Sequence, residues 1–131
     1  IKKLRQLGAL VVTPESLAAD EIEEEAASLS KRLFWTLGKR MIGSAFRFIN
    51  SQKLDGVIYL TSFGCGPEAL VEELVARIAK QQNMPLMMLT IDEHTGEAGI
   101  NTRLEAFTEM IVWRKKYAHH IPPYGESVHC R

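Results

Sequence analysis

Three short apolar runs, each followed by a helical pattern, constrain the fold of this chain more than any other feature. The runs cover residues 7–13, 56–61 and 86–91, and each is apolar on both faces. Such runs are typical of strands buried between two helix layers in a parallel sheet. Because strands and helices alternate, we expect an α/β fold with right-handed crossovers. The expected architecture is a three-layer α/β/α arrangement, flavodoxin-like or Rossmann-like, whose small and mostly parallel sheet has three or four strands.

The helical patterns place the remaining elements. A long stretch over 19–51 begins with acidic residues and carries an apolar stripe at steps of three and four, while Gly43 marks a bend or a close backbone contact. A second helix is predicted over 67–82, with Pro67 at its first position. A third is predicted to start near Thr102, where Thr102 and Glu105 have the spacing of a capping box.

The length of 131 residues fits one domain. We assign residues 1–117 to a single α/β domain and residues 118–131 to a tail or linker. The histidines and Cys130 of that segment fit a solvated tail better than a metal site, since the segment is terminal and contains Pro122 and Pro123. The first residue is Ile1 rather than Met, so we expect an excerpt of a longer multidomain chain.

Charge and cysteine content narrow the class of protein. Sixteen basic and sixteen acidic residues give a net charge of zero, which argues against nucleic acid and an anionic membrane as partners. The longest apolar stretch contains Lys39, Arg40 and Arg47, so no membrane-spanning helix is predicted. Two cysteines exclude a disulfide-dense secreted scaffold and favour a reducing compartment.

The first candidate site is the turn that follows the run at 56–61. Gly64 and Gly66 flank Cys65 there, just before a predicted helix. Glycines allow a sharp turn or close approach of a large ligand, and a helix N-terminus stabilises a thiolate. A small buried cysteine in a tight turn explains the same residues equally well.

The second candidate site follows the run at 86–91. Asp92, Glu93 and His94 leave the strand together and could bind metal, transfer protons or hold a loop. The competing interpretation is structural: the two carboxylates cap local N–H groups and pair with Arg103. Both loops are expected at the carboxyl edge of the sheet.

These loops also carry a family resemblance. The segments 63–67, 91–99 and 102–107 resemble the 2-hydroxyacyl-CoA dehydratase/benzoyl-CoA reductase-like superfamily, and more closely the C-terminal region of the large CoA-substrate-specific enzyme activases (2-hydroxyglutaryl-CoA dehydratase activator-related proteins). The resemblance covers roughly residues 8–111. One departure is that Glu68 and Ala69 stand where the family commonly has Asp and Ser.

The resemblance implies ATP-driven transfer of low-potential electrons through iron–sulfur clusters in anaerobic metabolism of CoA thioesters, and with it a cytoplasmic location. It makes Cys65 a ligand of a [4Fe-4S] cluster in the full-length protein, with Asp92, Glu93 and His94 beside it and Arg103 as their charge partner. With two cysteines the fragment alone should hold no cluster and should not be catalytic by itself. Expected partners are the remaining domains of the same chain, including an ATPase module, and a dehydratase or reductase.

The alternative is a module without a redox role. In that interpretation the helix start after Gly64 holds a phosphate or CoA anion, and Cys65 is incidental. A second form of it is an interaction domain that docks against the rest of its chain.

Overall fold

The computed structural model describes residues 1–27, 36–62, 66–92 and 95–117. Its elements in chain order are α1 (Lys2–Gln6), the 3-10 helix η1 (Pro14–Ser16), α2 (Ala19–Ala27), α3 (Thr36–Asn50), β1 (Val57–Ser62), α4 (Gly66–Gln81), β2 (Leu86–Ile91) and α5 (Glu97–Lys116).

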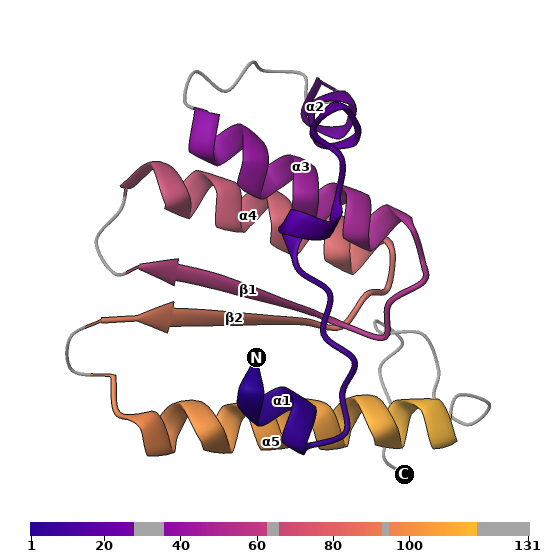
Figure 1. Ribbon diagram of the computed structural model, residues 1–131, viewed down its shortest axis with the longest axis vertical. Helices are drawn as coiled ribbons and strands as arrows, with labels where there is room; N and C mark the ends of the chain where they lie inside the picture. The colour runs from indigo at the N-terminus through magenta and orange to yellow at the C-terminus, as the bar shows by residue number, and fades with distance from the viewer. Residues whose placement is uncertain (28–35, 63–65, 93–94, 118–131) are drawn as a thin grey trace, which may run out of the picture.

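The two strands form a parallel sheet that lies between two helix layers (Figure 1). The register pairs Val57 with Leu86 and Ser62 with Ile91. Helices α3 and α4 cover one face of the sheet, with α2 packed on α3, and α5 covers the other face together with α1 (Figure 1). This arrangement confirms the predicted small α/β fold and the two strands expected over 56–61 and 86–91.

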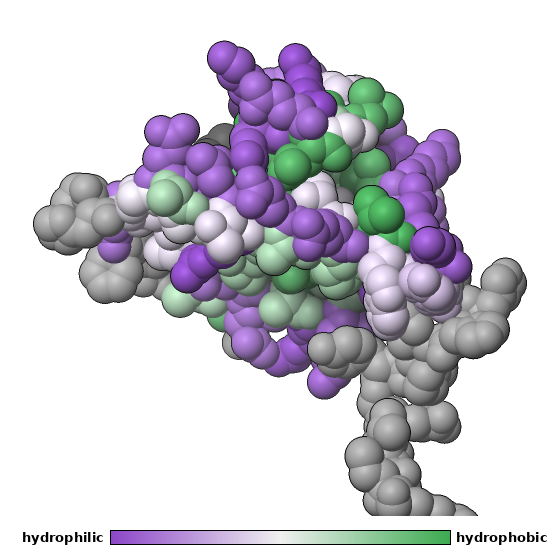
Figure 2. Space-filling view, turned by 90° about the horizontal axis from the view of Figure 1, so that it is seen from below, coloured by the Kyte–Doolittle hydropathy of each residue, from purple (hydrophilic) through white to green (hydrophobic). Residues whose placement is uncertain are grey.

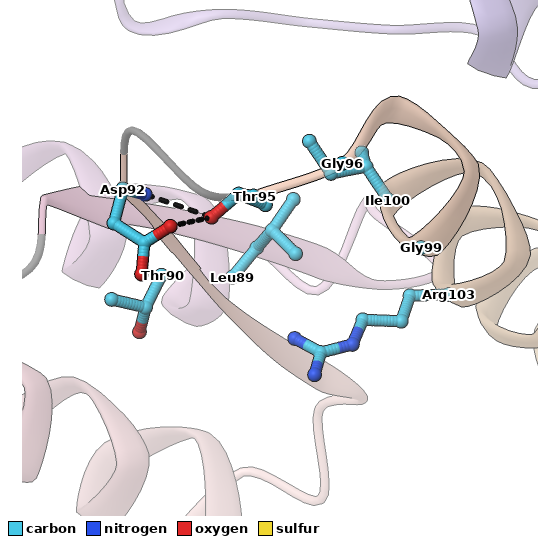
Figure 3. Close-up of a pocket in the computed structure, with 8 residues that line it drawn as sticks. All are labelled: Leu89, Thr90, Asp92, Thr95, Gly96, Gly99, Ile100 and Arg103. Atoms are coloured by element: carbon cyan, nitrogen blue, oxygen red, sulfur yellow. Dashed lines mark hydrogen bonds between the residues drawn. The ribbon is translucent and has the colours of Figure 1, made fainter.

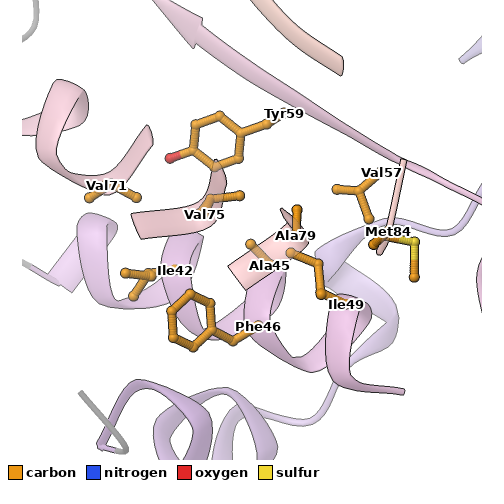
Figure 4. Packing of buried hydrophobic residues seen from close by; sticks show 10 residues of the cluster. All are labelled: Ile42, Ala45, Phe46, Ile49, Val57, Tyr59, Val71, Val75, Ala79 and Met84. Carbon is orange, nitrogen blue, oxygen red and sulfur yellow. The ribbon is translucent and has the colours of Figure 1, made fainter. Parts of the chain in front are cut away.

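The main core lies between the sheet and the α3–α4 layer (Figure 4). Ile42 and Ile49 of α3 and Val71 and Val75 of α4 are completely buried. Alternate residues of β1 point into this layer, so that Tyr59 is buried whereas its neighbour Leu60 is not. Val71 and Val75 were predicted on the buried face of α4, whereas Leu70, predicted on the same face, is 54% exposed.

The strand predicted over residues 7–13 is wrong. The segment after α1 connects the layer of α1 and α5 to the layer of α2, and it forms no backbone hydrogen bond with either strand (Figure 1). Gly8 has a φ of +82°, and Leu10 is 94% exposed. An apolar run becomes a strand only where it forms ladder hydrogen bonds with a neighbour, and this segment forms none with β1 or β2. The described sheet accordingly has two strands, fewer than the three or four expected.

The single long helix predicted over 19–51 is also wrong. The described parts form two helices, α2 and α3, which pack against each other. A Cβ atom added at Gly43 would lie 2.2 Å from the carbonyl oxygen of Ile22, so this glycine permits the backbones to approach closely. Arg47 of α3 binds Glu21 of α2 at 2.6 Å. Some of the acidic residues at the helix start thus pair between helices, and the expected close contact at Gly43 is confirmed.

Helix α5 begins before the predicted start. Gly96 is its N-cap, and Thr102 lies in its second turn. The Thr102 hydroxyl donates to the carbonyl oxygen of Ala98 at 3.0 Å and therefore does not cap the helix. Thr with Glu three residues later has the same spacing inside a helix, where the hydroxyl can bond to the carbonyl four residues before it.

The end of α5 lies at the amino ends of the strands. Arg114 donates to the carbonyl oxygen of Asn83, just before β2, and Lys115 binds Asp55, just before β1, both at 2.7 Å. A Cβ at Gly56 would come within 2.6 Å of Ile111, so α5 packs tightly on this end of the sheet. In the described part of the chain, no helix has the length and apolarity needed to span a membrane.

Candidate functional site

Both predicted loops follow the carboxyl ends of the strands. Strand β1 ends at Ser62 and α4 begins at Gly66, while β2 ends at Ile91 and α5 begins at Glu97. Parallel strands end at one edge of a sheet, so the structure brings the two loops to a common edge (Figure 1). Gly64 and Cys65 lie outside the described residues, although Cys65 immediately precedes the first residue of α4 in the sequence.

The turn after β2 is fixed by one side chain. The hydroxyl of Thr95 accepts the backbone N–H of Asp92 at 2.8 Å and donates to the Asp92 carboxylate at 2.6 Å (Figure 3). The Thr95 N–H also donates to the Asp92 carbonyl oxygen. Asp92 and Thr95 therefore close a tight turn, and the carboxylate of Asp92 is held at the sheet edge.

A hollow of about 490 Å³ opens beside this turn, between the end of β2 and the start of α5 (Figure 3). Its lining residues are Leu89, Thr90, Asp92, Thr95, Gly96, Gly99, Ile100 and Arg103. A Cβ atom added at Gly96 or Gly99 would meet no other atom within 4 Å, so there is free space beside both glycines in the hollow. The hollow combines a helix N-terminus, a carboxylate and a guanidinium.

The predicted cluster of charges is realised only in part. Asp92 and Arg103 line the same hollow, and the Asp92 carboxylate accepts a hydrogen bond from Thr95. Arg103 as the charge partner of Asp92, Glu93 and His94 therefore stays a prediction, since two of these three residues are outside the described part of the chain. Glu93 and His94 lie outside the described residues. Among the residues that the structure does describe, no three His, Cys, Asp or Glu side chains gather in a metal-binding group.

Sequence analysis overlooked the threonines of this edge. Thr95 fixes the turn, and Thr61 of β1 donates a long hydrogen bond of 3.4 Å to Thr90 of β2. An Asp followed three residues later by Thr is a pattern that closes turns through side-chain hydrogen bonds, so Thr95 could have been found. The pairing of Thr61 with Thr90 depends on strand register, which the sequence alone does not define.

The chain matches the family model of the 2-hydroxyglutaryl-CoA dehydratase D-component over residues 2–111. The family match and the α/β fold together define the class of the chain as a dehydratase-like α/β domain. The chain belongs to the 2-hydroxyglutaryl-CoA dehydratase D-component family, named for one component of a dehydratase that acts on a CoA thioester. This confirms the predicted superfamily, although the matching model is that of a dehydratase component and not of an activase. Neither a curated protein nor a solved structure matches the chain.

Proposed function

We propose that this chain is a dehydratase-type domain that supplies Cys65 as one ligand of an iron–sulfur cluster. The cluster would serve ATP-driven, low-potential electron transfer to a CoA-thioester-processing enzyme, within an activase-like or dehydratase-like assembly. The observation that carries the proposal is that β1 ends at Ser62 and the sixteen-residue helix α4 begins at Gly66, so that Cys65 directly precedes the helix in the sequence.

This position suits a thiolate. The first N–H groups of a helix have no partner within the helix and carry a partial positive charge, which lowers the pKa of a neighbouring thiol. The same groups can donate hydrogen bonds to cluster sulfur and tune its potential. The Asp92–Thr95 turn lies at the same edge of the sheet.

The donor set of this chain fits only part of a cluster site. Clusters are usually held by about four thiolates, and the chain has two cysteines, Cys65 and Cys130. The chain can therefore provide one wall of the site, whereas further ligands and the ATPase module would come from other parts of the protein or from partner components.

Anaerobic reconstitution with iron and sulfide tests this function on the protein as it occurs in the cell. We expect Cys65→Ser to lower both the bound iron and the visible charge-transfer absorption. The matched variant Cys130→Ser should retain them, because that cysteine is not assigned to the site. Unchanged iron content in Cys65→Ser would remove Cys65 from the ligand set.

A second candidate function rests on the hollow beside α5. Arg103 lines it and has no ion-pair partner among the described residues, and the α5 N-terminus opens into it. These groups are suited to a phosphate of CoA. Thermal shift with CoA, compared between the unaltered chain and Arg103→Gln, tests this alternative. Stabilisation that disappears in Arg103→Gln would support it, and an unchanged melting temperature with CoA would reject it.

A further inference from the structure

Helix α5 is apolar on two faces. On the face that contacts the sheet, Leu104 and Phe107 are buried. On the face turned toward solvent, Met110, Trp113 and Tyr117 follow one another at steps of three and four residues and are 40–55% exposed. A surface helix usually has one apolar face, and a helix that is apolar on all sides is usually buried. The solvent face of α5 therefore has the composition of a contact surface.

This surface, the α5 outer face, consists of Ala106, Met110, Trp113 and Tyr117. The ring centroids of Trp113 and Tyr117 lie 5.2 Å apart, and the Lys116 Nζ lies 5.6 Å from the centre of the Tyr117 ring. Seen from the α5 side, apolar and weakly polar side chains form a band between charged ones (Figure 2). Clustered tryptophan and tyrosine side chains are typical of the centres of protein interfaces. The outer face is thus suited to contact with another protein surface.

The charges beside the outer face indicate which protein surface fits it. Glu109 and Lys116 are both exposed and lie about two helical turns apart along one flank of the face. Two antiparallel copies of α5, related by a two-fold axis, would place Glu109 of each copy beside Lys116 of the other. In a parallel pair these two residues would lie at different levels along the helices and could not meet. The charge pattern is therefore complementary to itself in the antiparallel orientation.

The apolar side chains are self-complementary in the same arrangement. The register that joins Glu109 to Lys116 places Met110 against Trp113 of the second copy. It also places Ala106 against Tyr117 of the second copy. A small side chain thus lies opposite a large ring, and a thioether lies opposite an indole, which is a favourable contact. Such alternation of sizes allows two helices to pack closely.

We propose that the α5 outer face binds the same face of a second copy of this chain, with the two α5 helices antiparallel across a two-fold axis. The face extends over about three helical turns. An interface of this size lies below the roughly 1,600 Å² of a standard stable complex, so the dimer is weak and its population depends on concentration. The inference does not depend on the proposed function, because it needs neither iron nor CoA.

Charge reversal in the full protein tests the pairing. Sedimentation velocity over about a hundredfold range of concentration measures the dissociation constant of the dimer. Each reversal creates two contacts between like charges, so Glu109→Lys and Lys116→Glu should each raise this constant about tenfold or more. The double variant should restore association, and so should an equimolar mixture of the two single variants, because both arrangements join opposite charges between copies.

Glu24→Lys is the matched control, because it makes the same charge change at an exposed position of α2 and should leave the dissociation constant unchanged. A protein that stays monomeric at about 0.5 mM would overturn the proposal. A dimer that neither reversal weakens would overturn it as well. If the mixture of single variants failed to associate, the contact would involve a different surface, and the antiparallel pairing would be excluded.

Trp113→Ala gives a measurement that does not depend on charge. The indole lies in the middle of the outer face and is 55% exposed in the single chain. Its removal should raise the dissociation constant of the dimer about tenfold or more. The melting temperature of the dilute, monomeric protein should change little. A lower melting temperature with unchanged association would assign Trp113 to the stability of the single chain and would contradict the proposal.

Discussion

The hydroxyl of Thr95 bridges the backbone N–H and the carboxylate of Asp92, at 2.8 and 2.6 Å. One side chain thus satisfies a backbone donor at the end of β2 and orients an acid at the edge of the hollow. A hydrogen bond to a charged group contributes more to stability than one between neutral groups.

We therefore expect Thr95→Val, which keeps the shape but removes the hydroxyl, to lower the free energy of unfolding by about 1–2 kcal/mol. Urea denaturation measures the loss. Thr108→Val is the matched control: the Thr108 hydroxyl bonds only to carbonyl oxygens of its own helix, so its removal should cost much less. Equal losses in the two variants would contradict the role given to Thr95.

The contact between α2 and α3 gives a second prediction. Gly43→Ala would place a Cβ 2.2 Å from the carbonyl oxygen of Ile22, and a backbone atom cannot move aside as a flexible side chain does. We expect a loss of about 2–3 kcal/mol from overpacking, measured by thermal or urea unfolding.

Gly99→Ala is the control for this substitution, since a Cβ there meets nothing within 4 Å. In the first turns of α5 the alanine should be neutral or stabilise the protein by up to about 1 kcal/mol, because it reduces the entropy of the unfolded chain. If Gly43→Ala were as mild as Gly99→Ala, the helices could not cross as closely as described.

How far the sequence predicts this fold depends on what each element needs from the rest of the chain. The runs at 56–61 and 86–91 were predicted correctly because their strands pair with each other and are covered by helices. The run at 7–13 has similar composition, yet Leu10 is almost fully exposed and the run forms no backbone hydrogen bond with β1 or β2. Apolar composition indicates that a segment can form a strand. Whether a neighbouring strand is present to pair with it depends on the tertiary structure.

The sequence likewise predicts some features of the candidate site and not others. The sequence places Asp92 at the sheet edge because it follows a buried strand, and the structure agrees. The hydrogen bond to Asp92 could not be predicted from charge alone: the turn brings the Thr95 hydroxyl to the carboxylate, while Arg103 lines the same hollow. Cys65, Glu93 and His94 remain predictions, since they lie outside the described residues.

One substitution distinguishes the predicted start of α5 from the observed one, because each start predicts a different change in the free energy of unfolding. If Thr102 were an N-cap, Thr102→Ala would cost about 1 kcal/mol. In the structure Thr102 is an exposed residue inside the helix, and alanine has the higher helix propensity. We therefore expect no loss or a gain of up to about 0.7 kcal/mol in urea denaturation. A loss near 1 kcal/mol would restore the later helix start.

The ends of α3 and α4 provide the last prediction. Gln52 and Asn83, which follow these helices, have φ angles of +52° and +53°. This left-handed conformation costs most residues about 1–2 kcal/mol, and asparagine less, but it costs glycine little. The Gln52 side chain donates hydrogen bonds to Ile49 and Gln82 from an exposed position, so their loss offsets only part of the gain.

We expect Gln52→Gly to stabilise the protein by up to about 1 kcal/mol, and Asn83→Gly to stabilise it less, because asparagine already tolerates this conformation. Lys39→Gly, at an exposed position inside α3, is the opposing control and should destabilise by about 1 kcal/mol. Urea denaturation of the three variants ranks them. A destabilised Gln52→Gly would show that the left-handed turn between α3 and β1 is held by the glutamine side chain rather than strained by its backbone.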